Sequence, residues 1–400
     1  MRFSSRLANA QDELLESPWS SHVAAARSQR QIGFDLSVNN PSAVGLRPSP
    51  AHAEAILRAL SDPRALSYQP HPQAMLSARE AVCAHYLRAH DERVDPARVW
   101  LASSTSELYA QLFMLHCDPS SEVLVMQPSY PLFESLASLV SVAVRPFQLA
   151  LSDRWEVNLD ALARAVTERT RAIVCVTPNN PTGSTLRAHE LAAIAELCAE
   201  RGLALIVDEV FAEYVYETEE RDRARTTANE QRCLCWTLGG LSKSAALPQM
   251  KLGWAVLSGP DALVREAHAR FEHIADAFLS ASAPVLCAAP TMLSRAPAMR
   301  EAIIERAQRN IVAAREELTA DTGASVLPCE GGWTLVLRVP AVLSEDEWLR
   351  ALLDEDDVLV QPGYFYDFER EAFLIASLLT EPAVFREGVR RIAKRARALV

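Results

Sequence analysis

Lysine is nearly absent from this chain of 400 residues. Of its 40 basic residues only three are lysines, Lys243, Lys251 and Lys394, and arginine carries the rest of the positive charge. A lysine kept against such a bias is expected where the chemistry needs an amine that a guanidinium cannot replace. Two of the three stand eight residues apart, which draws attention to that segment, although chance placement also explains so small a number.

Long hydrophobic runs are missing as well. The longest uncharged apolar run, residues 278–293, contains two prolines and is short for a membrane span. The opening segment MRFSSRLANAQDELLES lacks the apolar core of a secretory signal. We therefore expect a cytoplasmic protein that does not bind a membrane.

Neither a basic excess nor a cysteine pattern for metal binding is present. The formal net charge is −11, which disfavours nucleic acid as a partner because phosphate backbones attract basic surfaces. The eight cysteines form no CxxC pair, and none lies at zinc-ligand spacing from a histidine, so we expect no metal. Cys175, Cys233 and Cys235 fall inside apolar runs and are predicted to be buried free thiols.

What is present is globular composition, 49% hydrophobic and 23% charged, in a length that suits two domains. Between residues 48 and 296, strand-like runs alternate with helical segments, which predicts an α/β domain with a mostly parallel sheet. Residues 297–400 predict a smaller α+β domain, on which residues 1–47 are expected to pack. The predicted strands of the large domain are 122–127, 141–147, 171–177, 203–210, 233–238 and 251–258, and the predicted helices are 53–61, 76–90, 159–168, 188–202 (ending on Gly202 as C-cap) and, beyond that domain, 298–320.

Two charged residues follow buried strands. Asp208 closes the apolar run LALIV, and a buried carboxylate needs a cation or strong donors, which a helix cap or a salt bridge would also supply. Lys243 follows CLCWTLGG, where loss of water would lower its pKa and make the amine nucleophilic. An ordinary exposed loop lysine is the alternative.

Two turns also carry polar groups. In PNNPTG (178–183) the asparagine amides could hydrogen-bond a ring hydroxyl, or the segment could be a plain turn. SSTSE (103–107) precedes a helix, where hydroxyls and free N–H groups make an anion site, unless Glu107 only completes a capping box. Parallel strands end at one edge of their sheet, so these segments should meet there. An amine, an acid, an amide and an anion site together match the requirements of pyridoxal phosphate.

With these segments in their order and spacing, the chain resembles the fold type I pyridoxal-phosphate enzymes of the class I/II aminotransferases. The most specific pieces are PSYP (128–131), PNNPTG, DEV (208–210) and the segment from Ser242 to Gly253. The resemblance implies a mostly parallel (mixed) seven-stranded sheet flanked by helices and a smaller α+β domain. It also implies a homodimer with shared active sites.

The resemblance also implies residue roles. Lys243 would form a Schiff base with pyridoxal 5′-phosphate and shuttle a proton, Asp208 would keep the pyridine nitrogen protonated, Asn180 would bind the ring 3-oxygen, and Tyr130 would stack on the ring. The phosphate would be bound by Ser104, Thr105, Ser242 and Lys251, and by Tyr68 reaching across the dimer interface.

Four positions depart from the family pattern. Lys251 replaces an arginine, which keeps the charge and loses the bidentate fork. Phe211 replaces a tyrosine, so the 3-oxygen loses a donor. Ser104 stands where glycine is usual, so that turn must suit a side chain. Ile375 stands where many members carry the arginine that binds the substrate α-carboxylate, and Arg338 and Arg47 are candidates to replace it.

We therefore predict an aminotransferase that exchanges amino and keto groups between a small-molecule amino donor and a 2-oxo acid. A C–S lyase or other eliminating enzyme on the same fold is the alternative, and a non-catalytic cofactor-binding domain is a third. Asn39–Pro41 and Gly331–Trp333 could line the substrate mouth, although Trp333 suits a core position equally well.

Overall fold

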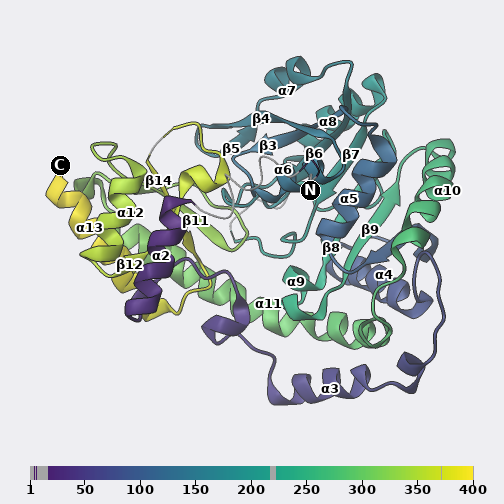
Figure 1. Ribbon diagram of the computed structural model, residues 1–400, viewed down its shortest axis with the longest axis horizontal. Helices are drawn as coiled ribbons and strands as arrows, with labels where there is room; N and C mark the ends of the chain where they lie inside the picture. Colours follow the sequence, from purple (N-terminus) through teal and green to yellow (C-terminus); the bar gives the residue numbers. More distant parts are fainter. Residues whose placement is uncertain (1–3, 5, 7–16, 217–221, 371, 400) are drawn as a thin grey trace.

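An eight-stranded mixed sheet forms the centre of the larger part of the molecule (Figure 1). The computed structural model describes residues 4, 6, 17–216, 222–370 and 372–399. The strand order is β2-β9-β8-β7-β6-β3-β4-β5. The five strands from β8 to β4 run parallel, whereas β9 and β5 are antiparallel to their neighbours. The strands are β2 (Val99–Ala102), β3 (Glu122–Gln127), β4 (Ala143–Leu151), β5 (Trp155–Val157), β6 (Thr170–Val176), β7 (Ala204–Asp208), β8 (Cys235–Gly240) and β9 (Gly253–Ser258).

The mostly parallel mixed sheet confirms the predicted fold class, with one strand more than the seven expected. The additional strand is β5, which has three residues and pairs with the end of β4. Three residues are too few to show an alternating pattern, so this strand is recognised only by its pairing with β4.

Helices cover both faces of this sheet, as the alternation along β2 illustrates. Trp100 packs in a cluster with residues of α5 and α10, whereas Val99 and Leu101 pack in a second cluster with α4 and α11. Successive side chains of a strand point to opposite faces, so one short segment contributes to two cores. The helices of this part are α3 (Pro50–Leu60), α4 (Leu76–His90), α5 (Thr105–His116), α6 (Leu132–Leu139), α7 (Leu159–Ala165), α8 (Ala188–Arg201), α9 (Leu241–Ser244), α10 (Asp261–Phe278) and α11 (Ala283–Glu317).

A separate core contains a four-stranded antiparallel sheet of order β10-β11-β14-β13. The N-terminal helix packs here through Trp19, and β1 pairs with β12 in parallel. The elements are α2 (Pro18–Gln29), β1 (Phe34–Asp35), β10 (Ser325–Val326), β11 (Thr334–Arg338), α12 (Glu345–Asp354), β12 (Val358–Leu359), β13 (Gln361–Pro362), β14 (Phe373–Ser377) and α13 (Pro382–Leu399).

The helix α11 belongs to both cores. The sequence predicts a helix from residue 298, but α11 begins at Ala283 and contains Pro290 and Pro297. Its first half buries residues such as Met292 against α4, and its second half buries Ile311 among the residues around β11. Burial of this apolar face on both sides outweighs the hydrogen bonds that the prolines remove. The predicted division near residue 296 falls inside this helix, and the assignment of two domains remains a prediction.

Other local predictions are confirmed. Gly202 is the C-cap of α8. It has a left-handed backbone, and its N–H donates to the Cys198 carbonyl. Cys175, Cys233 and Cys235 are buried, and all eight cysteines are free. Among the described residues no single helix has the length and apolar character to cross a bilayer, and only the strongly bent pair of α10 and α11 reaches that threshold by combining two helices.

Candidate active site

The polar segments predicted from the sequence meet at one edge of the large sheet. β6, β7 and β8 are parallel neighbours, so the PNNPTG turn, Asp208 and the segment leading to Lys243 all leave the sheet at the same edge. The start of α5 lies beside them, since a Cβ built on Gly240 would stand 3.7 Å from Thr105 Cγ2.

Asp208, the last residue of β7, is a buried carboxylate with two donors. The Val210 N–H donates to Oδ1 and the Tyr109 hydroxyl donates to Oδ2, both over 3.0 Å. Burial raises the pKa of Asp208 to about 6, although these two hydrogen bonds and the positive charge of Lys243 act in the opposite direction. The group is therefore ionised at neutral pH and well placed to bind a cationic partner.

Lys243 lies in α9, directly after β8. Burial lowers the pKa of its ammonium group, the charge of Asp208 opposes this, and the charge of Lys251 adds to it. Its Nζ stands 5.8 Å from the centre of the Phe211 ring and 5.4 Å from that of Trp333. The amine thus lies near two aromatic rings and interacts with the charge of Asp208. Because its pKa is lowered, it is a better nucleophile than an exposed lysine.

Tyr214 fixes the backbone at this lysine. Its hydroxyl donates to the Lys243 carbonyl over 2.7 Å, and its ring packs against both Phe211 and Trp333. Neither Tyr214 nor Tyr109 stands in a motif that marks it in the sequence. Tyr109 stands in the middle of a helical pattern, and only the packing of α5 on the sheet brings its hydroxyl to Asp208.

The PNNPTG turn is held from within. Asn179 is buried and donates through Nδ2 to the Pro128 carbonyl and to Thr182, both over 2.9 Å. Asn180 is half-buried and accepts from Thr334 through Oδ1 over 3.3 Å. Among the hydrogen bonds of the described residues, none uses Nδ2 of Asn180, which leaves that donor for a ligand.

The N-terminus of α5 is packed closely against the start of β9. A Cβ on Gly253 would stand 2.7 Å from the Ser104 carbonyl carbon and from the Thr105 nitrogen, so no side chain fits there. Ser104 caps α5, its Oγ accepting from the Glu107 N–H over 3.1 Å, and Glu107 accepts from the Ser103 N–H. This is the capping arrangement expected as the alternative to an anion site. It uses the Glu107 N–H, and the N–H groups of Thr105 and Ser106 make no hydrogen bond among the described residues.

The serine in place of glycine causes no strain. Ser104 has a φ of −163°, which is extended backbone open to any residue. Lys251 is exposed and has a left-handed φ of 55°, and its charge acts on Lys243. Ser242 is half-buried beside Lys243 in α9.

The two tyrosines predicted to serve the cofactor are exposed in this chain. Tyr130 follows β3 and is 48% exposed, and Tyr68 is 84% exposed. Tyr68 lines a different pocket, together with Ser280, Ser282 and Leu286. Lys243 is not among the residues that line this pocket.

Comparisons with known proteins agree with this geometry. Residues 31–392 match the family described as aminotransferase class I and II. The chain belongs to this family. An arginine–pyruvate transaminase, AruH, of Pseudomonas aeruginosa is 30% identical over 322 residues, which cover 79% of each protein. An alanine aminotransferase of Mycobacterium tuberculosis is 30% identical over 256 residues, and this match covers 63% of the chain and only 58% of that enzyme.

Solved aminotransferase structures share the fold over nearly the whole chain. An alanine aminotransferase from Pyrococcus furiosus superposes with a TM-score of 0.87 at 20% identity, covering 99% of this chain and 100% of that one. An aspartate aminotransferase from Thermus thermophilus gives 0.83 at 24% identity, covering 98% and 100%. At such identities the likeness concerns the fold alone.

Class I and II aminotransferases use pyridoxal 5′-phosphate, and the donor set of this chain fits that group. An amine for the aldehyde and a carboxylate for the ring nitrogen lie at the same sheet edge. Buried polar atoms without a hydrogen-bond partner among the described residues stand beside them, Oδ1 of Asn179 and Nε1 of Trp333. The glycine at 253 keeps the α5 N-terminus clear of side chains, as an anion site requires.

Ile375 stands where the resemblance places the carboxylate-binding arginine. Ile375 is buried in β14 opposite Val336 and packs with Leu327. Arg338 is exposed at the far end of β11, four residues or about 13 Å from Thr334. Arg47 is also exposed, but it lines a cavity of about 220 Å³ together with Ala245 and Leu247, which follow Lys243 closely.

Proposed function

We propose that this protein is an aminotransferase that exchanges amino and keto groups between an amino acid donor and a 2-oxo acid, with Lys243 as the amine that holds the cofactor. The observation that carries the proposal is the pairing of opposite charges at the sheet edge. Asp208 is buried and Lys243 is half-buried, and each opposes the effect of burial on the pKa of the other. Family membership supports the same reaction.

The cofactor would be held by residues from several elements. Pyridoxal phosphate supplies an aldehyde for covalent attachment and a ring that accepts electrons. Asp208 would hold a proton at the ring nitrogen, Nδ2 of Asn180 would donate to the ring oxygen, and Tyr130 would cover the ring face. The group that would bind the phosphate consists of Ser104, Thr105, Ser242 and Lys251.

Lys243 would also move the proton. Burial lowers the pKa of its ammonium group, which favours the neutral amine that can take a proton from the substrate Cα and return it. The hydrogen bond from Tyr214 to the Lys243 carbonyl keeps α9 in place while the side chain moves. The rings of Phe211 and Trp333 exclude water from the amine.

We infer that Arg47 binds the substrate carboxylate in place of an arginine at position 375. Of the two candidates it is the one that lines a cavity with residues following Lys243. Its Nε donates only to the nearby Ser42 carbonyl over 3.3 Å, so the guanidinium keeps further donors for a carboxylate.

A homodimer with shared sites is part of the proposal. Three leucines between residues 57 and 76 are largely exposed, Leu57 of α3 at 63%, Leu66 at 92% and Leu76 of α4 at 51%, and Leu76 lines one pocket with Tyr68. Exposed apolar side chains of this kind are expected where a second copy packs. In that dimer Tyr68 would reach the partner's phosphate site. Mass measurement by light scattering, with Tyr68→Ala as the variant that weakens cofactor binding, tests this.

A cytoplasmic location is also proposed. All eight cysteines are free thiols, two of them only half-buried, as is usual in a reducing compartment.

The experiment for the proposed reaction supplies the purified protein and cofactor with L-amino acids and simple amines, each with and without pyruvate. Transamination predicts that keto product forms only with an acceptor, in step with alanine, and without ammonia. Lys243→Ala should abolish it, and Lys394→Ala should not. Ammonia release without an acceptor would instead assign an eliminating enzyme. Binding of cofactor without turnover of any donor would contradict both reactions.

A further inference from the structure

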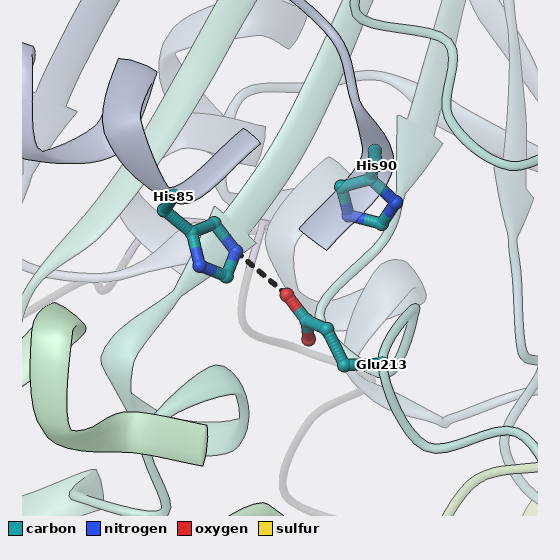
Figure 2. A group of neighbouring side chains, drawn as sticks. All are labelled: His85, His90 and Glu213. Carbon is teal, nitrogen blue, oxygen red and sulfur yellow. Dashed lines mark ion pairs between the residues drawn. The ribbon is translucent and has the colours of Figure 1, made fainter. Parts of the chain in front are cut away.

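Two histidines and a glutamate form a buried cluster that the proposed reaction does not use. His85 and His90 lie in the last turns of α4, and Glu213 lies in the segment after β7. Figure 2 shows the three side chains gathered around one small space. His85 Nε2 stands 2.6 Å from Glu213 Oε1, and one nitrogen or oxygen atom from each residue lies within 4.8 Å of the others.

The cluster contains atoms that can bind a metal ion and are not used in hydrogen bonds within it. The Glu213 side chain is only 9% exposed, and its Oε2 atom is buried and makes no hydrogen bond among the described residues. His90 is also buried and contributes one ring nitrogen to the group of ligand atoms.

One side of the cluster is open. His90 and Glu213 line a pocket of about 420 Å³ together with Glu301 and two arginines, Arg223 and Arg300. The pocket gives a route for an ion and room for a water ligand. A site with three protein ligands and one open position is typical of zinc sites that can exchange a ligand.

We propose that His85, His90 and Glu213 bind a divalent transition-metal ion such as Zn²⁺, with the remaining coordination position facing the pocket. Imidazole nitrogen and carboxylate oxygen are donors that such ions prefer. The ion would replace the hydrogen bond between His85 and Glu213, and the ligand atoms would adjust to bonds of about 2.0–2.2 Å.

Arg300 sets the affinity of this site. Its Nη1 stands 3.4 Å from Glu213 Oε1 without forming a hydrogen bond, so its positive charge opposes a cation at the same carboxylate. Removing that charge while keeping a polar side chain should therefore tighten metal binding. This response distinguishes the cluster from adventitious sites elsewhere, which Arg300 does not touch.

The experiment titrates the full-length, cofactor-saturated protein with Co²⁺, followed by its visible d–d absorption, and with Zn²⁺ in competition with a chromophoric chelator. We expect one ion per chain in the wild type, loss of that ion in His90→Gln, and binding at least roughly tenfold tighter in Arg300→Gln. His273→Gln, which alters an exposed histidine of α10, is the matched control and should bind as the wild type does.

The outcomes decide the proposal. Equal stoichiometry in wild type and His90→Gln, or absorption typical of cobalt–thiolate bonds, would place the ion elsewhere and overturn it. Absence of binding in both the wild type and Arg300→Gln would show that the three residues form only a structural ion pair. Unfolding curves of each variant, measured without metal, establish that the chain is folded.

Discussion

Tyr109 of α5 donates its hydroxyl hydrogen bond to Oδ2 of Asp208, across 3.0 Å and between two buried side chains. The carboxylate that would face the cofactor nitrogen is therefore oriented from behind by a helix on one face of the sheet. Positioning of this kind is what a proton-holding group needs, because it has only one productive direction.

Tyr109→Phe tests this relationship. The hydroxyl lowers the pKa of Asp208, so its removal should move that pKa above about 6. The acidic limb of the kcat/KM profile should shift to higher pH, with kcat reduced roughly tenfold, since a hydrogen bond to a charged group contributes about 1.5–3 kcal/mol. An unchanged acidic limb would show that Tyr109 has only a packing role.

Asp208 should make apoprotein stability fall as pH rises. Burial raises its pKa from 3.8 to about 6, so the folded chain binds the proton more tightly than the unfolded chain does. Its contribution is therefore lost between pH of about 4 and 6 and is constant above that. We expect Asp208→Asn to flatten this part of the curve and to leave the apoprotein no less stable at pH 7, while activity falls at least roughly a hundredfold. Chemical unfolding of wild type and variant across this pH range is the measurement, and parallel curves would contradict it.

Phe211→Tyr restores a hydroxyl beside the cofactor. The ring at 211 lies 5.8 Å from Lys243 Nζ, and a phenylalanine carries no hydrogen-bond donor. A new donor to the ring oxygen should stabilise its anionic form, so the pH at which the bound cofactor changes colour should fall. Spectrophotometric titration compares the two proteins, and identical titration midpoints would exclude contact between position 211 and that oxygen.

Gly253→Ala should separate two kinds of glycine effect. Its Cβ would stand 2.7 Å from backbone atoms of Ser104 and Thr105, so α5 must shift. We expect a loss of roughly 1–3 kcal/mol in unfolding free energy and weaker cofactor binding. Gly202→Ala is the control, because its Cβ meets nothing within 4 Å and only the φ of 63° is strained. Gly202→Ala should lose stability and keep its cofactor affinity. Weaker cofactor binding by both variants would show that the effect of Gly253→Ala does not come from the shift of α5.

Arg47→Gln and Arg338→Gln form a pair for substrate recognition. If Arg47 binds the carboxylate, its variant should raise KM for amino acid donors at least roughly tenfold and leave unfolding unchanged, since the side chain is exposed. Arg338 is exposed at the far end of β11, so its variant should react normally. A raised KM in Arg338→Gln and an unchanged KM in Arg47→Gln would instead place the substrate carboxylate beside β11.

Much of this arrangement is predictable from sequence because it depends on local patterns. The alternation of strands and helices, Gly202 at a helix end and the polar residues closing β7 and β8 are all properties of short segments. Parallel topology then brings strand ends together without further information. The family resemblance added the roles that spacing alone left open.

What could not be predicted depends on contacts between distant segments. Tyr109 and Tyr214 act through hydroxyls whose partners are 99 and 29 residues away. The early start of α11 depends on apolar burial on two sides, which no count of prolines reveals. The cluster of His85, His90 and Glu213 joins a helix to a loop more than 120 residues later, so no spacing rule finds it.

The continuity of α11 has a mechanical consequence. At about 1.5 Å per residue its 35 residues span about 52 Å, and both cores pack on the same rod. A change in the angle between those cores must therefore bend this helix. Pro290 and Pro297 each remove a backbone hydrogen bond, so bending costs least near them. Any closing motion around a substrate is thus expected to bend α11 near Pro290 and Pro297, two residues that take no part in the proposed reaction.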